Sequence, residues 1–119
     1  PVINGDGNYS RDFTYIDNVI QANLLSLVTS NEKAINTVYN VAYGDRNTLN
    51  DLMNYLKEYL SEFDSKISSI EVVYGPNRLG DIPHSHASVD KAKENLNYNP
   101  QFTLQLGLKE AVKWYWENL

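Results

Sequence analysis

The sequence has 119 residues, 42% of them hydrophobic, and a formal net charge of −5 at pH 7. This length suits one small globular domain, and the negative charge excludes nonspecific nucleic-acid binding, which depends on many lysines and arginines. The absence of cysteine excludes disulfides and thiolate metal sites, and no run approaches the roughly 20 apolar residues of a membrane span.

The amino-terminal residues predict a strand followed by a turn. The chain begins with Pro1 and shows no signal or transit peptide, so we expect a cytoplasmic protein and a segment cut from a longer one. Val2 and Ile3 form the expected strand. The Asn-Gly and Asp-Gly steps within residues 4–8 favour the positive φ of a tight turn.

The next segment predicts an amphipathic helix over residues 18–29. Asp17 precedes it and supplies a carboxylate that is able to cap the first turn. The apolar residues fall at helical spacing and are expected to share one buried face: Ile20, Leu24, Leu27 and Val28.

The middle of the chain predicts a strand and a second helix. Residues 37–41 are rich in β-branched and aromatic side chains and are typical of a strand. Thr48 and Asp51 have the spacing of a capping box, and apolar residues keep helical spacing from Leu49 to Phe63.

The last fifty residues predict a strand, a long loop and two helices. Residues 70–74 form the strand, which ends at a Gly-Pro step, and residues 77–87 form the loop. Asp90 is expected to cap a short helix, and Thr103 is expected to open the final one. This order suits a small mixed α/β layer, with too few strands for a complete dinucleotide-binding fold.

Two of the three arginines, Arg11 and Arg78, lie in loops beside glycine and aspartate. A guanidinium matches phosphate oxygens two at a time, so the pair could clamp a diphosphate. The alternative is two ordinary surface ion pairs of little energetic value. Arg11 would then pair with Asp12 or Asp17, and Arg78 would pair with Asp81.

Other candidate motifs have simpler explanations. His84 and His86 form a His-x-His pair, but no further histidine or cysteine completes a metal site, so we expect loop or packing residues and no metal. Residues 5–7 lack the spacing of a phosphate loop. The aromatic residues 114–116 fit packing with one exposed tryptophan, or else a partner surface.

Several motifs occur in a fixed order along the chain. Asn-Gly-Asp-Gly at residues 4–7 precedes Ser-Arg-Asp-Phe-Thr-Tyr-Ile-Asp-Asn-Val at residues 10–19. Arg-Leu-Gly-Asp begins at Arg78, and a tail combines residues 96–100 with Gly-Leu at 107–108 and Trp-Tyr at 114–115. The ordered set resembles the substrate-binding domain of extended short-chain dehydrogenase/reductase enzymes, most of all UDP-sugar 4-epimerases of the NAD-dependent epimerase/dehydratase family.

This resemblance covers nearly the whole chain and carries expectations about fold and function. It implies that residues 1–119 are a carboxyl-terminal nucleotide-sugar-binding domain of mixed α/β (α+β) class, without the Rossmann NAD-binding domain. The bound molecule would be a UDP-sugar used for polysaccharide precursors. Nucleotide-sugar 4,6-dehydratases and decarboxylases share versions of the same motifs and remain alternatives.

The resemblance also implies roles for particular residues. Arg11 and Arg78 would contact the substrate diphosphate, and Asp81 would accept hydrogen bonds from the ribose hydroxyls. These roles suit the side chains, because a diol needs an acceptor-only group and a diphosphate needs charged donors. The strand from Val2 to Asn4 would present backbone groups to the uracil edge.

Ser85 occupies the position that looks like the family's gatekeeper against the sugar. A bulky aromatic residue there narrows the pocket, whereas a small residue leaves room for a 2-acetamido group. Serine thus favours UDP-N-acetylglucosamine and UDP-N-acetylgalactosamine. The alternative is a loop serine that hydrogen-bonds its own backbone.

Two features that the family's chemistry requires do not occur in this sequence. No glycine-rich turn has the spacing that places a dinucleotide at a helix N-terminus, and none of the nine tyrosines has a lysine four residues later. The resemblance therefore implies that NAD and the catalytic residues belong to an amino-terminal Rossmann domain of the parent enzyme. This chain would hold the nucleotide and supply no catalytic residue.

Two alternatives of another kind stay open. The chain could act alone as a noncatalytic nucleotide-binding module, or it could be a structural fragment. Apolar helix surfaces would normally pack against the Rossmann domain, and their exposure would favour homo-oligomers.

Overall fold

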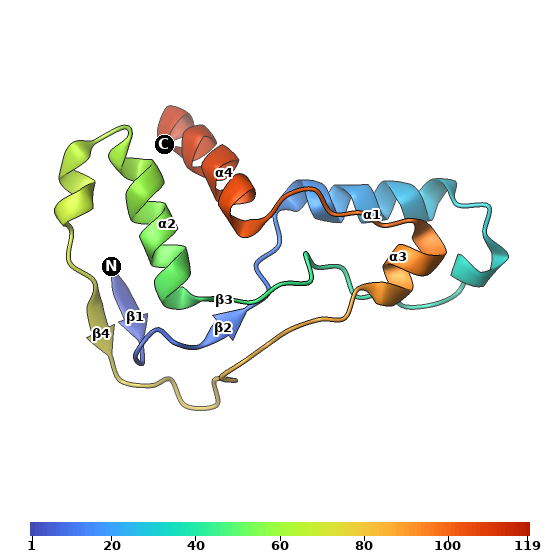
Figure 1. Cartoon of the computed structure of the whole chain (residues 1–119), viewed down its shortest axis with the longest axis horizontal. Helices are drawn as coiled ribbons and strands as arrows, with labels where there is room; N and C mark the ends of the chain where they lie inside the picture. Colours follow the sequence, from blue (N-terminus) through green and yellow to red (C-terminus); the bar gives the residue numbers. More distant parts are fainter.

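The computed structural model describes residues 1–119 as four α-helices, two short 3₁₀ helices and four short strands (Figure 1). The helices are α1 (Ile16–Val28), η1 (Glu32–Ala34), α2 (Leu49–Ser61), η2 (Ser65–Ser69), α3 (Asp90–Leu96) and α4 (Leu104–Asn118). The strands are β1 (Val2–Asn4), β2 (Ser10–Arg11), β3 (Asn47–Thr48) and β4 (Val73–Gly75). The predicted mixed α/β class is confirmed.

The strands form two separate pairs. β1 and β4 are parallel, with Val2 opposite Val73, and β2 and β3 are antiparallel, with Arg11 opposite Asn47. The predicted strand over residues 70–74 is wrong in its bounds, because η2 occupies residues 65–69 and pairing starts only where the Val73 amide donates to the Pro1 carbonyl (3.1 Å).

The strand predicted over residues 37–41 is wrong. These residues have the composition of a strand, but none of their backbone amides donates a hydrogen bond. A strand needs a neighbour for its ladder, and the chain places none here. The Lys91 ammonium instead contacts the Thr37 hydroxyl and the Val38 carbonyl.

The predicted buried face of the first helix is also wrong. Asn18 and Ala22 are the buried residues of α1, and Leu25 packs against the core. The predicted residues are all exposed: Ile20, Leu24, Leu27 and Val28. They keep helical spacing, but no element of this chain covers that side of α1.

Helix starts follow the predictions in two of four cases. The Thr48–Asp51 capping box of α2 and the Thr103 cap of α4 are confirmed. Asp17 lies inside the first turn of α1, where a carboxylate suits the positive end of the helix dipole, and Tyr15 is the N-cap. Likewise, Asp90 begins α3 and does not cap it.

The core is small and the molecule is flat. Only 14 of the 119 residues are buried, and the central cluster contains three alanines. The molecule measures 53 × 35 × 19 Å, and its radius of gyration of 17.1 Å exceeds the about 13 to 14 Å of a compact domain of this length. The core that a small globular domain of this length would form is therefore incomplete in this chain. No helix combines the length and apolar character needed to cross a membrane.

Candidate functional site

The candidate site joins β2 to the loop of residues 76–87. The Arg11 guanidinium donates through NH2 to Asp81 Oδ1 at 2.6 Å, and the two side chains are 29% and 28% exposed. The predicted surface pairs are wrong: Arg11 pairs with neither Asp12 nor Asp17, and Arg78 does not pair with Asp81. The Asp12 carboxylate instead accepts from the Gly44 amide (3.1 Å).

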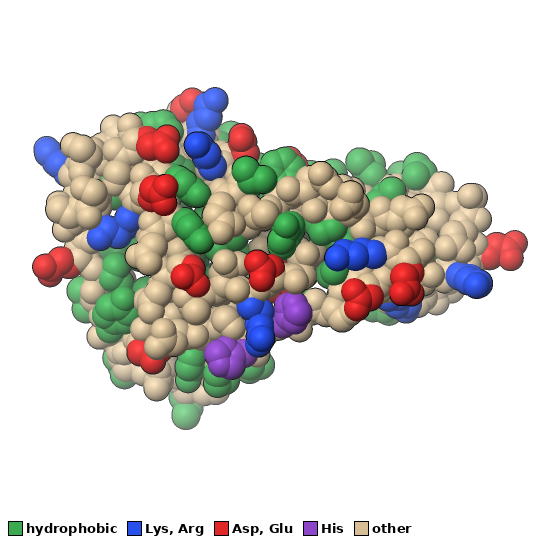
Figure 2. All heavy atoms as spheres, in the orientation of Figure 1, with side chains coloured by type: hydrophobic (Ala, Val, Ile, Leu, Met, Phe, Trp, Pro, Cys, Tyr) green, Lys and Arg blue, Asp and Glu red, His purple; other side chains and the backbone are tan.

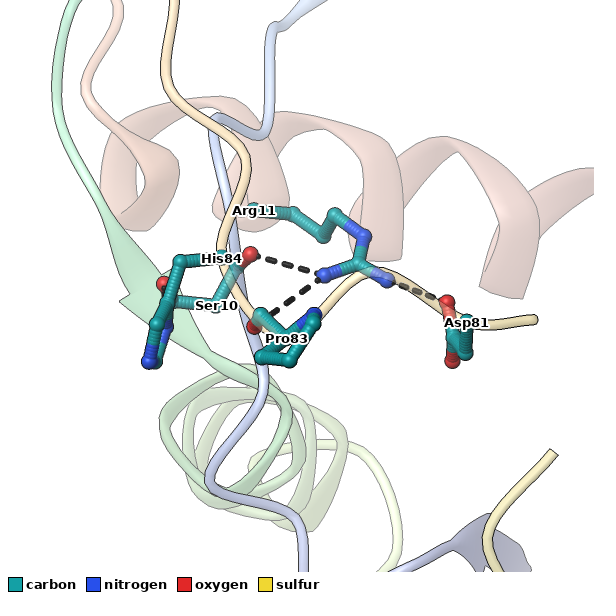
Figure 3. A network of polar contacts seen from close by, with 5 residues as sticks. All are labelled: Ser10, Arg11, Asp81, Pro83 and His84. Atoms are coloured by element: carbon teal, nitrogen blue, oxygen red, sulfur yellow. Dashed lines mark hydrogen bonds and ion pairs between the residues drawn. The ribbon is translucent and has the colours of Figure 1, made fainter. Parts of the chain in front are cut away.

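Backbone hydrogen bonds hold the loop against β2, and Figure 3 shows Ser10 beside Pro83 and His84. The Ser10 amide donates to the Pro83 carbonyl (2.9 Å), and the Ser85 amide donates to the Ser10 carbonyl (3.1 Å). Between them, the Ser10 hydroxyl lies 2.9 Å from His84 Nδ1. This parallel bridge brings together residues 74 positions apart.

Only some of the N–H donors of the Arg11 guanidinium form hydrogen bonds within the protein. Its NH1 group donates to the Ser10 carbonyl (2.9 Å) and the Pro83 carbonyl (3.5 Å), in addition to the NH2 bond to Asp81. A guanidinium has five N–H donors. Two therefore remain for a ligand, on a group whose position is already fixed.

Arg78 lies in the same loop, and no hydrogen bond or ion pair fixes its side chain. Its carbonyl accepts from the Asp81 amide (3.2 Å) in a turn, and Gly80 sits there at φ +80°, a conformation that favours glycine. The Arg78 side chain is exposed and forms no ion pair. It is the uncompensated positive charge of the loop.

The predicted base-binding strand β1 has one free edge. The Pro1 carbonyl and the Gly5 amide bond to β4. Because the peptide groups of a strand alternate in direction, those of Val2 and Asn4 point away from β4. These groups are free for an external partner.

The turn after β1 leads directly to β2, and the end of β4 leads to Arg78. Gly5, Asp6, Tyr9, Tyr74 and Asn77 border a hollow of about 470 Å³ at this end of the parallel pair. The hydrogen bond from the Asn8 amide keeps the pKa of Asp6 below its usual value, so this carboxylate is charged at neutral pH. This negative charge would repel a diphosphate but would not repel a neutral base.

Ser85 is exposed at the end of the bridge. Its amide bonds to Ser10, and its hydroxyl forms no hydrogen bond in the structure, including the bond to its own backbone that the alternative predicts. Sequence reasoning missed Ser10, Pro83 and His84. The sequence draws attention to His84 only as part of the His-x-His pair, and nothing in it predicts the contact with Ser10.

Comparisons with known proteins agree with the predicted resemblance. Residues 1–42 match the model of the NAD dependent epimerase/dehydratase family. The UDP-glucose 4-epimerase of Thermotoga maritima, solved with UDP-glucose, is 38% identical with a TM-score of 0.82, over 98% of this chain and 34% of that one. The UDP-N-acetylglucosamine 4-epimerase of Methanobrevibacter ruminantium, solved with UDP-N-acetylmuramic acid, is 35% identical with a TM-score of 0.84, over 100% of this chain and 35% of that one.

A further relative performs different chemistry. The UDP-N-acetyl-alpha-D-glucosaminuronate decarboxylase of Bacillus cytotoxicus is 28% identical over 98% of this chain and 35% of that protein. The chain thus spans about a third of the length of the relatives that it matches. The resemblance to this group of nucleotide-sugar enzymes is confirmed along nearly the whole chain.

Proposed function

We propose that this chain, as a segment of an enzyme of the NAD dependent epimerase/dehydratase family, binds the UDP part of a UDP-sugar during 4-epimerisation. The observation that carries the proposal is the guanidinium of Arg11, fixed beside the Asp81 carboxylate with two donors unused. Arg78 adds an exposed positive charge on the same loop.

The three parts of UDP fit three kinds of group in the site. The diphosphate needs charged donors, which Arg11 and Arg78 supply. The ribose diol needs an acceptor, which the second oxygen of Asp81 supplies. The uracil edge needs donors and acceptors in fixed positions, which the free backbone groups of Val2 and Asn4 supply.

The cofactor in the family's name does not fit the residues of this chain. A dinucleotide pyrophosphate is bound where a glycine-rich turn opens a helix. The residues before α1, α2, α3 and α4 are Tyr15, Thr48, Val89 and Thr103, with no such turn. We therefore assign NAD and the reacting groups to a Rossmann domain elsewhere in the parent enzyme.

The exposed surface supports such a partner domain. The accessible surface is 8149 Å², against about 6,600 Å² for a compact monomer of this mass. The excess of about 1,500 Å² is ample for a stable interface, to which each partner commonly contributes about 800 Å². Leu27 of α1 is 81% exposed and Val38 is 85% exposed. The bare face of α1 and the unpaired segment of residues 37–41 are the surfaces that we expect the partner domain to cover.

The small side chain of Ser85 favours an N-acetylated substrate, UDP-N-acetylglucosamine or UDP-N-acetylgalactosamine, over UDP-glucose. A decarboxylase is the second candidate, because the Bacillus cytotoxicus relative aligns with nearly the whole chain. Both candidates require the same UDP site and differ in the sugar chemistry.

The proposal is tested by calorimetric titration of the protein with UDP. Arg78→Ala removes the free positive charge and is expected to weaken UDP binding by about tenfold, since a charge-assisted hydrogen bond contributes about 1.5 to 3 kcal/mol. Lys33→Ala is the matched control, because Lys33 is an exposed cation in η1, at the opposite end of the molecule. Absence of UDP binding, or equal loss in both variants, would contradict the proposed function.

Substrate preference is tested separately with Ser85→Tyr in the whole enzyme. The larger side chain is expected to lower kcat/KM for the N-acetylated sugar relative to UDP-glucose by roughly tenfold or more, as pocket size commonly does. Ser85→Ala keeps the pocket open and should leave the ratio unchanged. An unchanged ratio in Ser85→Tyr would remove the gatekeeper role.

A further inference from the structure

We propose that His84 is a positioning residue: through its hydrogen bond to Ser10 it fixes the register between β2 and the loop, and so sets Arg11 and Asp81 in place. The inference rests on the proposed function, because its readout is UDP binding. The His84 side chain does not contact the ligand-binding side chains directly. It acts on Arg11 and Asp81 only through the backbone of β2 and of the loop.

The loop of residues 76–87 has few attachments. Its hydrogen bonds to the rest of the chain all involve one of two residues, Ser10 or Arg11. Its remaining backbone bond, from the Asp81 amide to the Arg78 carbonyl, is internal. The position of Asp81 and Arg78 therefore depends on how the loop meets β2.

Two backbone hydrogen bonds alone would fix this register weakly. A shift of one residue preserves backbone pairing but exchanges the side-chain faces. Ser10 is 6% exposed, and its hydroxyl has His84 Nδ1 as its partner at 2.9 Å. A shifted loop would leave this buried hydroxyl without a partner, which costs about 1 to 3 kcal/mol. The side-chain bond therefore selects one register.

That register determines the geometry of Arg11. The two carbonyls that accept from NH1 belong to Ser10 and Pro83, which are themselves joined by the bridge. Figure 3 shows the guanidinium between these carbonyls on one side and Asp81 on the other. A one-residue shift would remove the Pro83 carbonyl from NH1 and move Asp81 by about 3.3 Å along the strand direction, which breaks the 2.6 Å contact.

Histidine can be replaced conservatively here. Either the hydroxyl donates to Nδ1 or Nδ1–H donates to the hydroxyl, depending on the tautomer. An asparagine side chain carries both an acceptor and a donor at about the distance of Nδ1 from the backbone. His84→Asn should therefore keep the bond in either case, whereas His84→Ala removes it.

The experiment compares UDP affinity by calorimetry in the whole protein that contains this chain, for wild type, His84→Ala, His84→Asn and His86→Ala. His84→Ala is expected to weaken UDP binding by about tenfold, the equivalent of one lost hydrogen bond, and His84→Asn should restore most of it. His86 is the matched control, because it is an exposed imidazole with no hydrogen bond two residues away.

Thermal melting accompanies each titration. If His84→Ala lowers the melting temperature but binds UDP as wild type does, the positioning role is overturned and only a stabilising role remains. Equal losses in His84→Ala and His84→Asn would also overturn it. If wild type does not bind UDP, the proposed function itself fails, an outcome distinct from the other two.

Discussion

Among single residues, Asn18 connects two parts of the chain that lie far apart in the sequence. No sequence pattern predicts this role. Its side chain is 1% exposed. Its amide nitrogen donates to the Phe102 carbonyl (2.8 Å), and its oxygen accepts from the amides of Gln101 (3.0 Å) and Phe102 (3.1 Å). The start of α1 is thereby attached to the segment that leads into α4.

Asn18→Ala should leave these partly buried backbone groups of Gln101 and Phe102 without their partner. Because each unsatisfied group costs about 1 to 3 kcal/mol, we expect the free energy of unfolding to fall by about 2 to 3 kcal/mol in urea titrations. Asn23→Ala, on the exposed side of the same helix, should change it by about 0.5 kcal/mol or less. Equal effects of the two variants would contradict the assigned role.

Gly107 gives a second prediction for a single residue, in which two effects oppose each other. Alanine in a helix gains about 1 kcal/mol of propensity over glycine. A Cβ at Gly107, however, would lie 2.5 Å from Tyr15 Cβ and 2.8 Å from Tyr15 Cγ, so the helix or the tyrosine would have to move. Overpacking costs about 1 to 3 kcal/mol.

We therefore expect Gly107→Ala to be destabilising by about 1 kcal/mol in thermal unfolding. In a Tyr15→Gly background, Gly107→Ala should lose this effect, because both clashing carbons of Tyr15, Cβ and Cγ, are then absent. A stabilising Gly107→Ala would mean that the contact between α4 and the start of α1 is looser than described.

Among the elements, α2 has the start that the sequence specifies most completely. The Thr48 side chain accepts from the Asp51 amide (3.0 Å), and the Asp51 carboxylate accepts from the Thr48 amide (2.9 Å). Thr48→Ala removes a cap worth about 1 kcal/mol. The expected fall in unfolding free energy is measured by chemical denaturation, with Thr48→Ser as the variant that retains the cap.

The same cap makes stability depend on pH. Hydrogen bonds from the Thr48 hydroxyl and amide lower the pKa of Asp51 below 3.8 in the folded chain. A lowered carboxyl pKa contributes stability that is fully present above the unfolded pKa and lost as pH falls through the folded pKa. Asp51→Asn should therefore reduce the melting temperature at pH 6, and this effect should shrink as the pH falls through the lowered pKa of the folded state.

Elements could be predicted from sequence where local chemistry decides them. The capping box and the Thr103 cap are local, and both helices begin where predicted. The strand over residues 37–41 depends on a neighbour that the chain does not provide, and the face of α1 depends on what packs there. Local patterns were right about helical spacing and wrong about burial, because burial is a property of the surroundings.

The site was predictable to a similar degree. Arg11 and Asp81 are candidates because of their residue types and motifs, but nothing in the sequence predicts a contact between them across 70 positions. Their actual contact follows from the bridge of Ser10 with His84. Ordered motifs single out candidate side chains, whereas their hydrogen-bond partners require the fold.

For the whole molecule, the distribution of apolar side chains indicates an incomplete assembly. Figure 2 shows hydrophobic side chains at the surface among charged ones, including over the region of α1. Exposed apolar faces promote association. Leu24→Lys combined with Leu27→Lys should keep the 119-residue chain monomeric in sedimentation experiments, at concentrations where the unchanged chain associates.

Leu119→Lys is the control for that pair, since Leu119 is exposed at the end of α4 and away from the α1 face. In the whole protein the α1 double variant should instead lower stability, because charged groups would enter the proposed interface. If the unchanged chain already sediments as a monomer and the substitutions do not alter this, the proposed interface is contradicted.

The 19 Å thickness of the molecule also has a kinetic consequence. A molecule this thin shields few amides by depth, so protection from deuterium exchange comes mainly from the hydrogen bonds of its helices and strand pairs. Amides of residues 37–42, which have no acceptor, should exchange within seconds in the chain alone. In the complete enzyme the same amides would become slow, and their exchange time would report how long the two parts of the protein stay together.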